Sequence, residues 1–367
     1  MRILPYELRK VLCYPLIWGI IAVFVGFNVF FVYSNVGYTD FQREIREMHE
    51  VVLGNIQEGE LYDLYTQYKA LYSGSYNDLD MQSIKRMKEK MLKFEPDGSY
   101  AEFINSNYDK LQKRVKQIEA DGDTDRGFYP GDIFGIHGKL SSLLRLCIIE
   151  ALIIMCLSVL YLMDFERINH TEDLVFPSWI GRSAMRIKLR AGIIGGMLFA
   201  ALVLVVSVGA FFLFVPMSGL WRTSVSSYLV MESNGLWEYP FITFVRLNIW
   251  QELVLELVVA LLTVLLIGLI AGTVQLFVNN SYFTIICIAS VFVGFLALPV
   301  TIRNASWIKT AVSLTPSTMW RYCGRWFIEN DMPVSFAWSE FFTLGIWFML
   351  TIIFLLCGIR FMQTKDI

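Results

Sequence analysis

Hydrophobic residues in this 367-residue chain gather into six long runs, separated by polar segments of very unequal length. Each run is long enough to form a helix that crosses the hydrocarbon core of a bilayer, which takes about 20 mainly apolar residues. The pattern therefore predicts an all-α integral membrane protein with six transmembrane helices. The predicted spans are Tyr14–Ser34, Leu140–Met163, Ala191–Pro216, Leu247–Val278, Tyr282–Ile302 and Phe341–Phe361.

The longest polar segment, residues 35–139, follows the first span and has the periodicity of helices. Apolar side chains recur three or four residues apart, as on one face of a helix, and turn formers separate the stretches. The four apolar faces are Phe41, Ile45, Met48 and Val52; Leu61, Leu64, Tyr65, Tyr68, Leu71 and Tyr72; Met81, Ile84, Met87 and Met91; and Ile104, Tyr108, Leu111, Val115 and Ile118. These faces either form the private core of a small bundle or stay open for a substrate vestibule or a dimer contact.

The composition excludes an ordinary soluble protein. Hydrophobic residues make up 55% of the chain and charged residues 17%, whereas soluble chains are about 25% charged. The net charge of −2 gives no sign of a nucleic-acid partner. The polar insert contains no cysteine, so no disulfide framework is expected there. The first apolar run is too long for a cleavable signal and lacks a small-residue cleavage site, so we expect it to remain as a span.

Basic residues indicate the orientation, because Lys and Arg accumulate in short cytoplasmic loops. They occur before the first span, in 164–190 and in the C-terminal tail, which six spans place on one side. Both termini are therefore predicted to be cytoplasmic, with residues 35–139 as an extracellular helical domain. The loop 303–340 opposes this orientation, with Arg303, Lys309, Arg321 and Arg325 on the predicted outer side. The predicted divisions are 1–34 (interfacial helix and first span), 35–139, 140–163 (second span), 164–190 (cytoplasmic loop) and 191–367 (remaining spans).

Two short segments imitate ligand-binding motifs without the residues that those motifs need. In the acidic segment Asp121–Asp132, which also contains Asp123 and Asp125, Arg126 stands where a calcium loop has glycine. Its last position is aspartate instead of the bidentate glutamate. Gly138–Lys139 is followed by leucine instead of the serine or threonine of a phosphate loop. We expect neither segment to bind its ligand.

The chain shows no nucleotide-binding motif and no catalytic constellation. Its three histidines, His49, His137 and His170, are scattered along the sequence and do not form a metal-ligand pattern. We therefore predict no catalytic residues, no metal site and no enzymatic activity of its own.

Four ionisable residues lie inside predicted spans, where charge is costly and a functional role is the first hypothesis. Arg145 and Glu150 lie in the second span, and Glu252 and Glu256 share one helix face in the fourth. The latter two either line an outward cavity or pair with Arg246 or Arg145 at headgroup depth. Glu150 lies deeper in its span, and we predict that it makes a buried polar contact. All four are candidates for a transport pathway.

Glycines in two spans permit close contact between helices. Gly268 and Gly272 in the fourth span have the spacing of a small-residue contact motif, and Gly195–Gly196 lies in the third. Packing within the chain is the simpler hypothesis, and a dimer seam is the alternative.

The segment Asp164–Arg182, after the second span, is the strongest local signal for function. Its apolar and polar residues between Thr171 and Pro177 suit a short helix on the inner membrane surface. Such a surface helix is a natural contact through which another protein could transmit a movement to the spans. The less specific interpretation is a basic linker that only follows the charge rule.

Here the chain resembles the permease subunits of ABC-2 type transporters. These show a glutamate, then Gly-Thr, a leucine, a proline followed by small and basic residues, and a lysine entering the third span. The residues that match in order are Glu166, Thr171, Leu174, Pro177, Arg182 and Lys188. His170 replaces the glycine, and the stretch from proline to arginine is longer than is common. The N-terminal Tyr6–Leu12, with Glu7, Arg9 and Lys10, resembles the interfacial helix of the family.

The resemblance implies that ATP is hydrolysed by another polypeptide, which drives this one. Two six-span permeases, alike or different, would pair in a bacterial plasma membrane. Two cytoplasmic ATPase subunits would bind the coupling loop 164–190 and the N-terminal helix. ATP and Mg²⁺ would belong to those subunits, and this chain would hold no cofactor. Short helices that dip into the outer leaflet are implied near 305–327.

The leading hypothesis is the transmembrane subunit of an ATP-driven exporter of a peptide, drug-like or other amphipathic substrate. The large insert resembles the branch that contains sodium-extrusion permeases and many exporters of Gram-positive bacteria, so sodium extrusion is an alternative. Another is a membrane sensor or immunity component that binds a peptide at the outer face. A secondary transporter is disfavoured, because the single insert and unequal loops give no inverted repeat.

Overall fold

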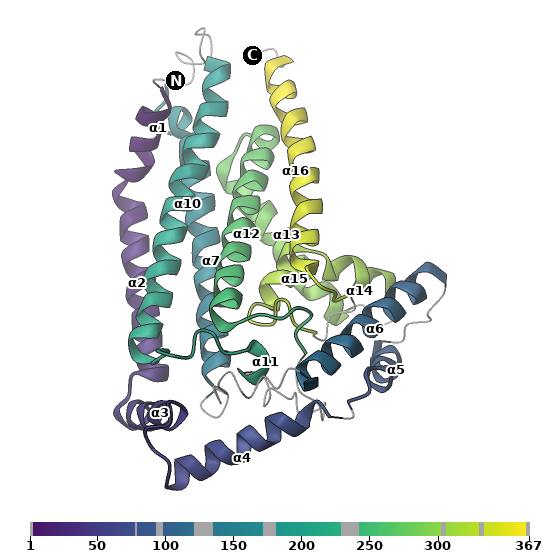
Figure 1. Cartoon of the computed structure of the whole chain (residues 1–367). Coiled ribbons are helices and arrows are strands. Elements are labelled where there is room, and N and C mark those ends of the chain that lie inside the picture. The colour runs from purple at the N-terminus through teal and green to yellow at the C-terminus, as the bar shows by residue number, and fades with distance from the viewer. Residues whose placement is uncertain are drawn as a thin grey trace.

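The computed structural model describes residues 3–77, 79–92, 98–120, 135–171, 181–228, 242–301, 306–329 and 334–364. In these ranges the chain is helical and contains no β-strand, only two isolated bridges. Six of the described helices are long and apolar enough to cross a membrane, which gives the architecture of a multi-pass membrane protein. They stand side by side, with both termini at one end (Figure 1). We call this end the terminal end, and the opposite end, where α3–α6 lie, the insert end.

The spanning helices continue past the predicted apolar runs. α7 begins at Ile136 instead of Leu140, and α10 begins at Gly181 instead of Ala191. Residues such as Arg186 and Lys188 are good helix formers, so nothing stops the helix where the apolar run ends. The six helices are α2 (Pro15–Val36), α7 (Ile136–Met163), α10 (Gly181–Phe214), α12 (Ile249–Val278), α13 (Ser281–Thr301) and α16 (Ser339–Thr364).

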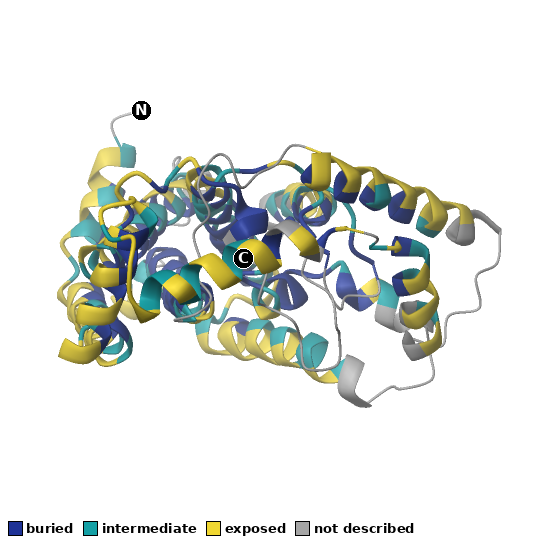
Figure 2. Ribbon diagram, turned by 60° about the horizontal axis from the view of Figure 1, so that its bottom comes forward, coloured by how far each residue is buried: buried dark blue, intermediate teal, exposed yellow. Residues whose placement is uncertain are grey.

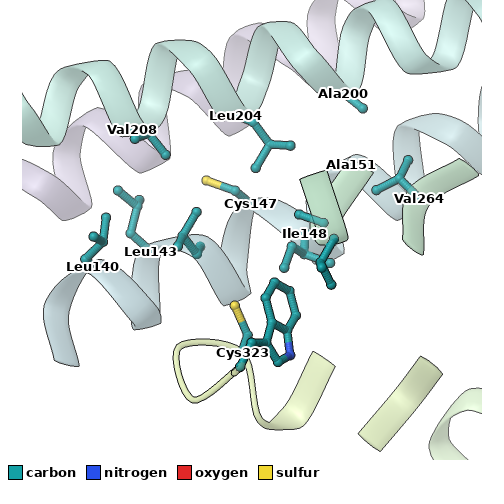
Figure 3. Close-up of a cluster of buried hydrophobic side chains, with 14 of the residues drawn as sticks. Leu140, Leu143, Cys147, Ile148, Ala151, Ala200, Leu204, Val208, Val264 and Cys323 are labelled. Atoms are coloured by element: carbon teal, nitrogen blue, oxygen red, sulfur yellow. The ribbon is translucent and has the colours of Figure 1, made fainter. Parts of the chain in front are cut away.

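α7 is the central helix of the bundle. It packs against α10, α12 and α2, and its side chains Leu143, Cys147 and Met155 are completely buried. Figure 3 shows Leu204 and Val208 of α10 on one side of α7 and Cys323 on the other. By contrast, only 6% of the apolar window of α13 is buried. The bundle is therefore built around α7, and α13 lies at its surface.

The N-terminal helix α1 (Ile3–Leu12) lies beside α10 at the terminal end (Figure 1). It ends shortly before Pro15, which begins α2 and suits the first position of a helix because its missing N–H is not needed there. Trp18 bridges the junction by donating from Nε1 to the carbonyl of Leu12 at 2.7 Å. Val11 and Ile17, from the two sides of the junction, are both buried in one apolar cluster with residues of α7 and α10.

The first helix of the insert packs on the spanning helices. Phe41 and Ile45 of α3 (Thr39–Val52) join the main core with Val36 of α2. The ammonium group of Lys139 lies 3.9 Å above the centre of the Phe41 ring. Of the two hypotheses for the insert, the private core is therefore wrong for the apolar face of α3, because this face packs on the ends of α2 and α7.

The other insert helices share a second core. They are α4 (Glu60–Ser75), α5 (Met81–Leu92) and α6 (Gly98–Ala120). The buried side chains of this second core are Tyr72, Tyr76, Met81, Ile84, Tyr108, Leu111, Val115 and Ile118, and Ile242 from the segment before α12 joins them. These helices thus share a core, as the bundle hypothesis expects, but the core also includes Ile242 from outside the insert and is not private to it. In Figure 2 the outer helices of the molecule carry exposed residues on one face and buried residues on the other.

Hydrogen bonds tie this second core to distant segments at the insert end. Asn107 of α6 donates to the carbonyl of Ser335 at 2.7 Å, and the Tyr76 hydroxyl donates to that of Ser226 at 3.3 Å. Ser226 belongs to the short helix α11 (Val225–Tyr228), and Ser335 precedes α16. Two further short helices, α14 (Ser306–Ser313) and α15 (Pro316–Arg321), lie at the same end, in the region where short outer helices were expected.

The glycines of the third and fourth spans are positions of close packing inside the chain. A Cβ atom on Gly196 would lie 2.7 Å from the sulfur of Met155, and one on Gly268 would lie 2.6 Å from the same atom. Gly195 and Gly272 face Val11 and Leu189 in the same way. The hypothesis of packing within the chain is confirmed for these glycines.

The closest approach of α10 to α7 gives a test of this packing. A Cβ atom on Gly192 would lie 2.8 Å from Cα of Val159 and 3.1 Å from the carbonyl oxygen of Ser158. Because these are backbone atoms, Gly192→Ala must push the helices apart, and we expect it to cost about 1–3 kcal/mol. Gly209→Ala in the same helix has nothing within 4 Å and is the matched control. Thermal unfolding in detergent measures both variants, and equal melting temperatures would contradict the close approach.

Candidate functional site

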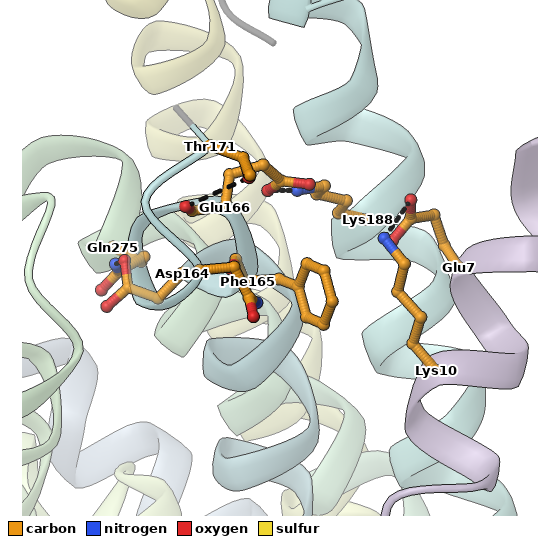
Figure 4. Close-up of polar contacts among 9 residues, drawn as sticks. Glu7, Lys10, Asp164, Phe165, Glu166, Thr171, Lys188 and Gln275 are labelled. Carbon is orange, nitrogen blue, oxygen red and sulfur yellow. Dashed lines mark hydrogen bonds and ion pairs between the residues drawn. The ribbon is translucent and has the colours of Figure 1, made fainter. Parts of the chain in front are cut away.

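A buried ion pair joins the segment after α7 to the start of α10. Glu166 lies in the short helix α8 (Phe165–Ile168), and its carboxylate pairs with the ammonium group of Lys188. The two side chains are only 11% and 4% exposed. Removing one member of such a pair leaves an uncompensated buried charge, which is strongly unfavourable. The pair therefore fixes α8 against α10 (Figure 4).

The N-terminal helix adds a second pair beside the first. Lys10 Nζ lies 2.9 Å from Glu7 Oε1, and Glu7 is buried. The same ammonium group lies 4.1 Å above the centre of the Phe165 ring, a distance that allows a cation–π interaction. Figure 4 shows Lys188 on α10 next to the Glu7–Lys10 pair. α1 and α8 are thus connected through Lys10.

A third set of contacts reaches the turn between α12 and α13. Asp164 is buried, and its carboxylate accepts hydrogen bonds from Gln275 Nε2 at 2.9 Å and from the Ser281 hydroxyl at 2.5 Å. Gln275 in turn accepts a hydrogen bond from the hydroxyl of Thr284 at 2.8 Å. Arg167 donates to the carbonyl of Asn279 in the turn itself. The end of α7 is therefore bonded to α12 and α13 as well as to α1 and α10.

The structure brings together part of the predicted coupling set. Glu166, Lys188, Glu7 and Lys10 form the paired cluster, and the amide of Thr171 donates to the carbonyl of Glu166 at 2.8 Å. Arg9 is exposed, and Arg182 lies in the first turn of α10. Leu174 and Pro177 lie outside the described residues.

Sequence reasoning missed Asp164, Gln275 and Ser281. A signal was present for Gln275, because it is an amide side chain near the end of an otherwise apolar span, where polar groups need a partner. Asp164 is the first acidic residue after the second span, but no pattern in its own segment indicates that it binds the turn between α12 and α13.

His170 has a backbone conformation that is unusual for a residue other than glycine. Its φ angle is +54°, in the left-handed region that favours glycine. The residue is exposed, so the backbone conformation, and not the packing of its side chain, is what this position demands. The backbone at this position thus has a conformation that glycine adopts more readily than histidine.

Glu150 is held in a polar cluster between three spanning helices. Asn28 of α2 donates from Nδ2 to Glu150 Oε2 at 2.6 Å and to the Ser207 hydroxyl of α10 at 2.9 Å. All three side chains are buried, with exposures of at most 3%. The predicted buried polar contact of Glu150 is confirmed, and its partners were not foreseen. Such contacts between helices add to association within a bilayer.

The remaining pathway candidates lie nearer the insert end. Arg145 donates from Nη2 to the carbonyl of Cys323 at 3.3 Å, and Glu252 and Glu256 are both buried. Burial raises the pKa of the Cys323 thiol well above its usual value; the charge of Glu256 adds to this rise and that of Arg145 opposes it. Arg145 and Glu256 therefore lie within electrostatic reach of one thiol, while Glu150 belongs to the separate cluster with Asn28.

Comparisons of the chain with protein-family models, curated proteins and solved structures find no match. The functional proposal therefore depends on the residues and contacts described above.

The Glu166–Lys188 pair gives a thermodynamic prediction. We expect Lys188→Met and Glu166→Gln each to lower the free energy of unfolding by about 3–5 kcal/mol, because each strands a buried partner. The double variant should lose much less than the sum, since no unpaired charge remains. Arg43→Met is the control, because its pair with Asp40 is exposed and worth about 0–1 kcal/mol. Additive losses in a double-mutant cycle, measured by thermal unfolding, would show that the two side chains are independent.

The left-handed backbone at His170 gives a second prediction. A β-branched residue fits this region poorly, so we expect His170→Val to destabilise the fold by about 1–2 kcal/mol. His170→Gly should keep or raise the melting temperature, because glycine adopts positive φ freely. If the valine variant unfolds at the same temperature as the glycine variant, the assigned backbone conformation is wrong.

Proposed function

We propose that this chain is the transmembrane permease subunit of an ATP-driven ABC exporter in a bacterial plasma membrane. The observation that carries the proposal is the joined cluster at the terminal end. There Glu166, Lys188, Glu7 and Lys10 connect the three segments in which the chain resembles ABC-2 type permeases. The partners would be two cytoplasmic ATPase subunits, which bind ATP and Mg²⁺, and a second copy of this permease or a paralogue.

The contacts of this cluster support a route for mechanical coupling. A displacement of α1 or α8 acts on α10 through the buried Glu166–Lys188 pair and on α12 and α13 through Asp164. It also acts directly on α7, which α8 follows and which runs through the centre of the bundle. A movement that begins at the terminal end thus reaches the insert end through one continuous helix.

In this proposal the terminal end faces the cytoplasm and the insert helices face outward. The substrate is a peptide, a drug-like molecule or another amphipathic compound. Arg145, Glu252 and Glu256 remain pathway candidates in this proposal, and the carboxylate of Glu150 already accepts a hydrogen bond from Asn28. A sodium-extrusion permease is the alternative within the same architecture. A peptide sensor is the alternative outside it, and it draws on the separate core of α4–α6.

The exposed surface of α1 provides a test that spares the buried pairs. Tyr6 is 68% exposed and Arg9 is exposed as well, so Tyr6→Asp and Arg9→Glu should leave the fold intact. We expect both variants to lose most of the ATPase partner that copurifies with the wild-type chain in mild detergent. Arg222→Glu, an exposed residue after α10 at the insert end, is the control.

Substrate-stimulated ATP hydrolysis in liposomes should fall in parallel with copurification. Purification of the wild-type chain without any Walker-type ATPase would contradict the proposal, as would peptide binding with no effect on ATP hydrolysis. The second outcome would favour the sensor.

A further inference from the structure

A polar cavity of about 450 Å³ opens at the insert end of the bundle. It lies between the first turns of α7 and the segment that begins at the end of α15. None of its described lining residues is acidic. Its basic and hydroxyl side chains are Arg145, Arg321, Arg325, His137, Ser141 and Ser142. The charged side chains that line the cavity are therefore all basic, which favours an anion there.

The walls of the cavity are fixed to each other. His137 Nε2 lies 2.6 Å from the carbonyl oxygen of Gly324, and Trp320 donates from Nε1 to the carbonyl of Arg145 at 2.8 Å. Gly324 has a φ angle of +87°, and a Cβ atom there would overlap the side chain of Ser141. Only glycine permits this close approach, so the cavity is a built feature and not a gap between loose segments.

Arg145 has donor capacity that the described residues do not use. Its Nε is buried and lacks a hydrogen-bond partner among the described residues, and its Nη2 donates to the neutral carbonyl of Cys323. Arg321 contacts the ring of Tyr322, with its guanidinium carbon 5.9 Å from the ring centre. A buried donor without a partner is costly, and the natural partner for the planar fork of a guanidinium is a carboxylate or phosphate.

We propose that this cavity binds the phosphate group of an anionic ligand between Arg145 and Arg321. His137 and the hydroxyls of Ser141 and Ser142 line the same space and supply further polar contacts. Arginine suits this role because it can bind two oxygens of one phosphate at once. The inference stands whether or not the chain works with an ATPase.

The position of the cavity indicates two sources for such a phosphate. His137 and Arg145 lie in the first turns of a spanning helix, the level at which phospholipid headgroups meet water. The phosphate is therefore that of an anionic lipid headgroup or of a soluble phosphate compound, which share the same chemistry. Arg321 and Arg325 belong to the loop 303–340, whose basic residues oppose the predicted orientation. A role in binding phosphate would account for these two arginines on the predicted outer side.

The test is a binding titration of the purified full-length protein in detergent. Three probes are compared by isothermal calorimetry: inorganic phosphate, dihexanoyl phosphatidylglycerol and dihexanoyl phosphatidylcholine. We expect saturable binding of at least one anionic probe and at least tenfold weaker binding in Arg145→Gln and Arg321→Gln. Arg222→Gln, an exposed arginine outside the cavity lining, should bind like the wild type. Because Arg321 is exposed, its variant tests the cavity even where Arg145→Gln fails to fold.

The outcomes separate the two sources and can overturn the proposal. Binding of inorganic phosphate supports a soluble phosphate compound, and binding of phosphatidylglycerol alone supports a lipid headgroup. The proposal is wrong if neither anionic probe binds, or if phosphatidylcholine binds as tightly as phosphatidylglycerol. It is equally wrong if Arg321→Gln and Arg145→Gln bind like the wild type, or if Arg222→Gln loses as much affinity as they do.

Discussion

Charged and polar groups buried along one central helix constrain the rest of this structure. α7 is enclosed by α2, α10 and α12, yet Arg145 and Glu150 lie within it and Glu166 follows its end. A buried charge is tolerated only when it is paired or hydrogen-bonded. Glu150 and Glu166 find their partners on other segments, in the amide of Asn28 and the ammonium group of Lys188; the half-buried Arg145 donates to the carbonyl of Cys323 and keeps a donor, Nε, without a partner among the described residues.

These contacts determine which helices stand next to α7. Lipid tails are as apolar as leucine, so apolar side chains alone give little preference for one neighbour over another in a bilayer. The polar contacts supply that preference at three levels of the bundle, and close packing at Gly192 and Gly196 completes it. α13 lies largely outside this system, since it touches the network mainly through the turn at Ser281. The proposed coupling follows from this arrangement, because the terminal cluster and the insert-end cavity lie at opposite ends of one helix.

The sequence was a good guide wherever a property adds up over many residues. The six spans follow from sums over about 20 residues, and the apolar stripes of α4–α6 from helical periodicity. The sequence was a poor guide to which residues contact each other across the fold. The stripe of Phe41 and Ile45 shows that a face is buried but not that it packs on spanning helices. Likewise, Asp164 and Gln275 are 111 residues apart, and no local pattern links them. The orientation in the membrane stays a prediction from charge.

The account depends most on the claim that the Glu166–Lys188 end faces the cytoplasm. Cysteine accessibility in intact cells measures this directly, in a chain whose six native cysteines are replaced by serine. Leu53 at the insert end and Ile168 at the terminal end are 44% and 60% exposed, so each can carry a single cysteine. We predict that a membrane-impermeant maleimide labels Leu53→Cys in intact cells and Ile168→Cys only after permeabilisation. Labelling of Ile168→Cys in intact cells, with Leu53→Cys protected, would contradict the account.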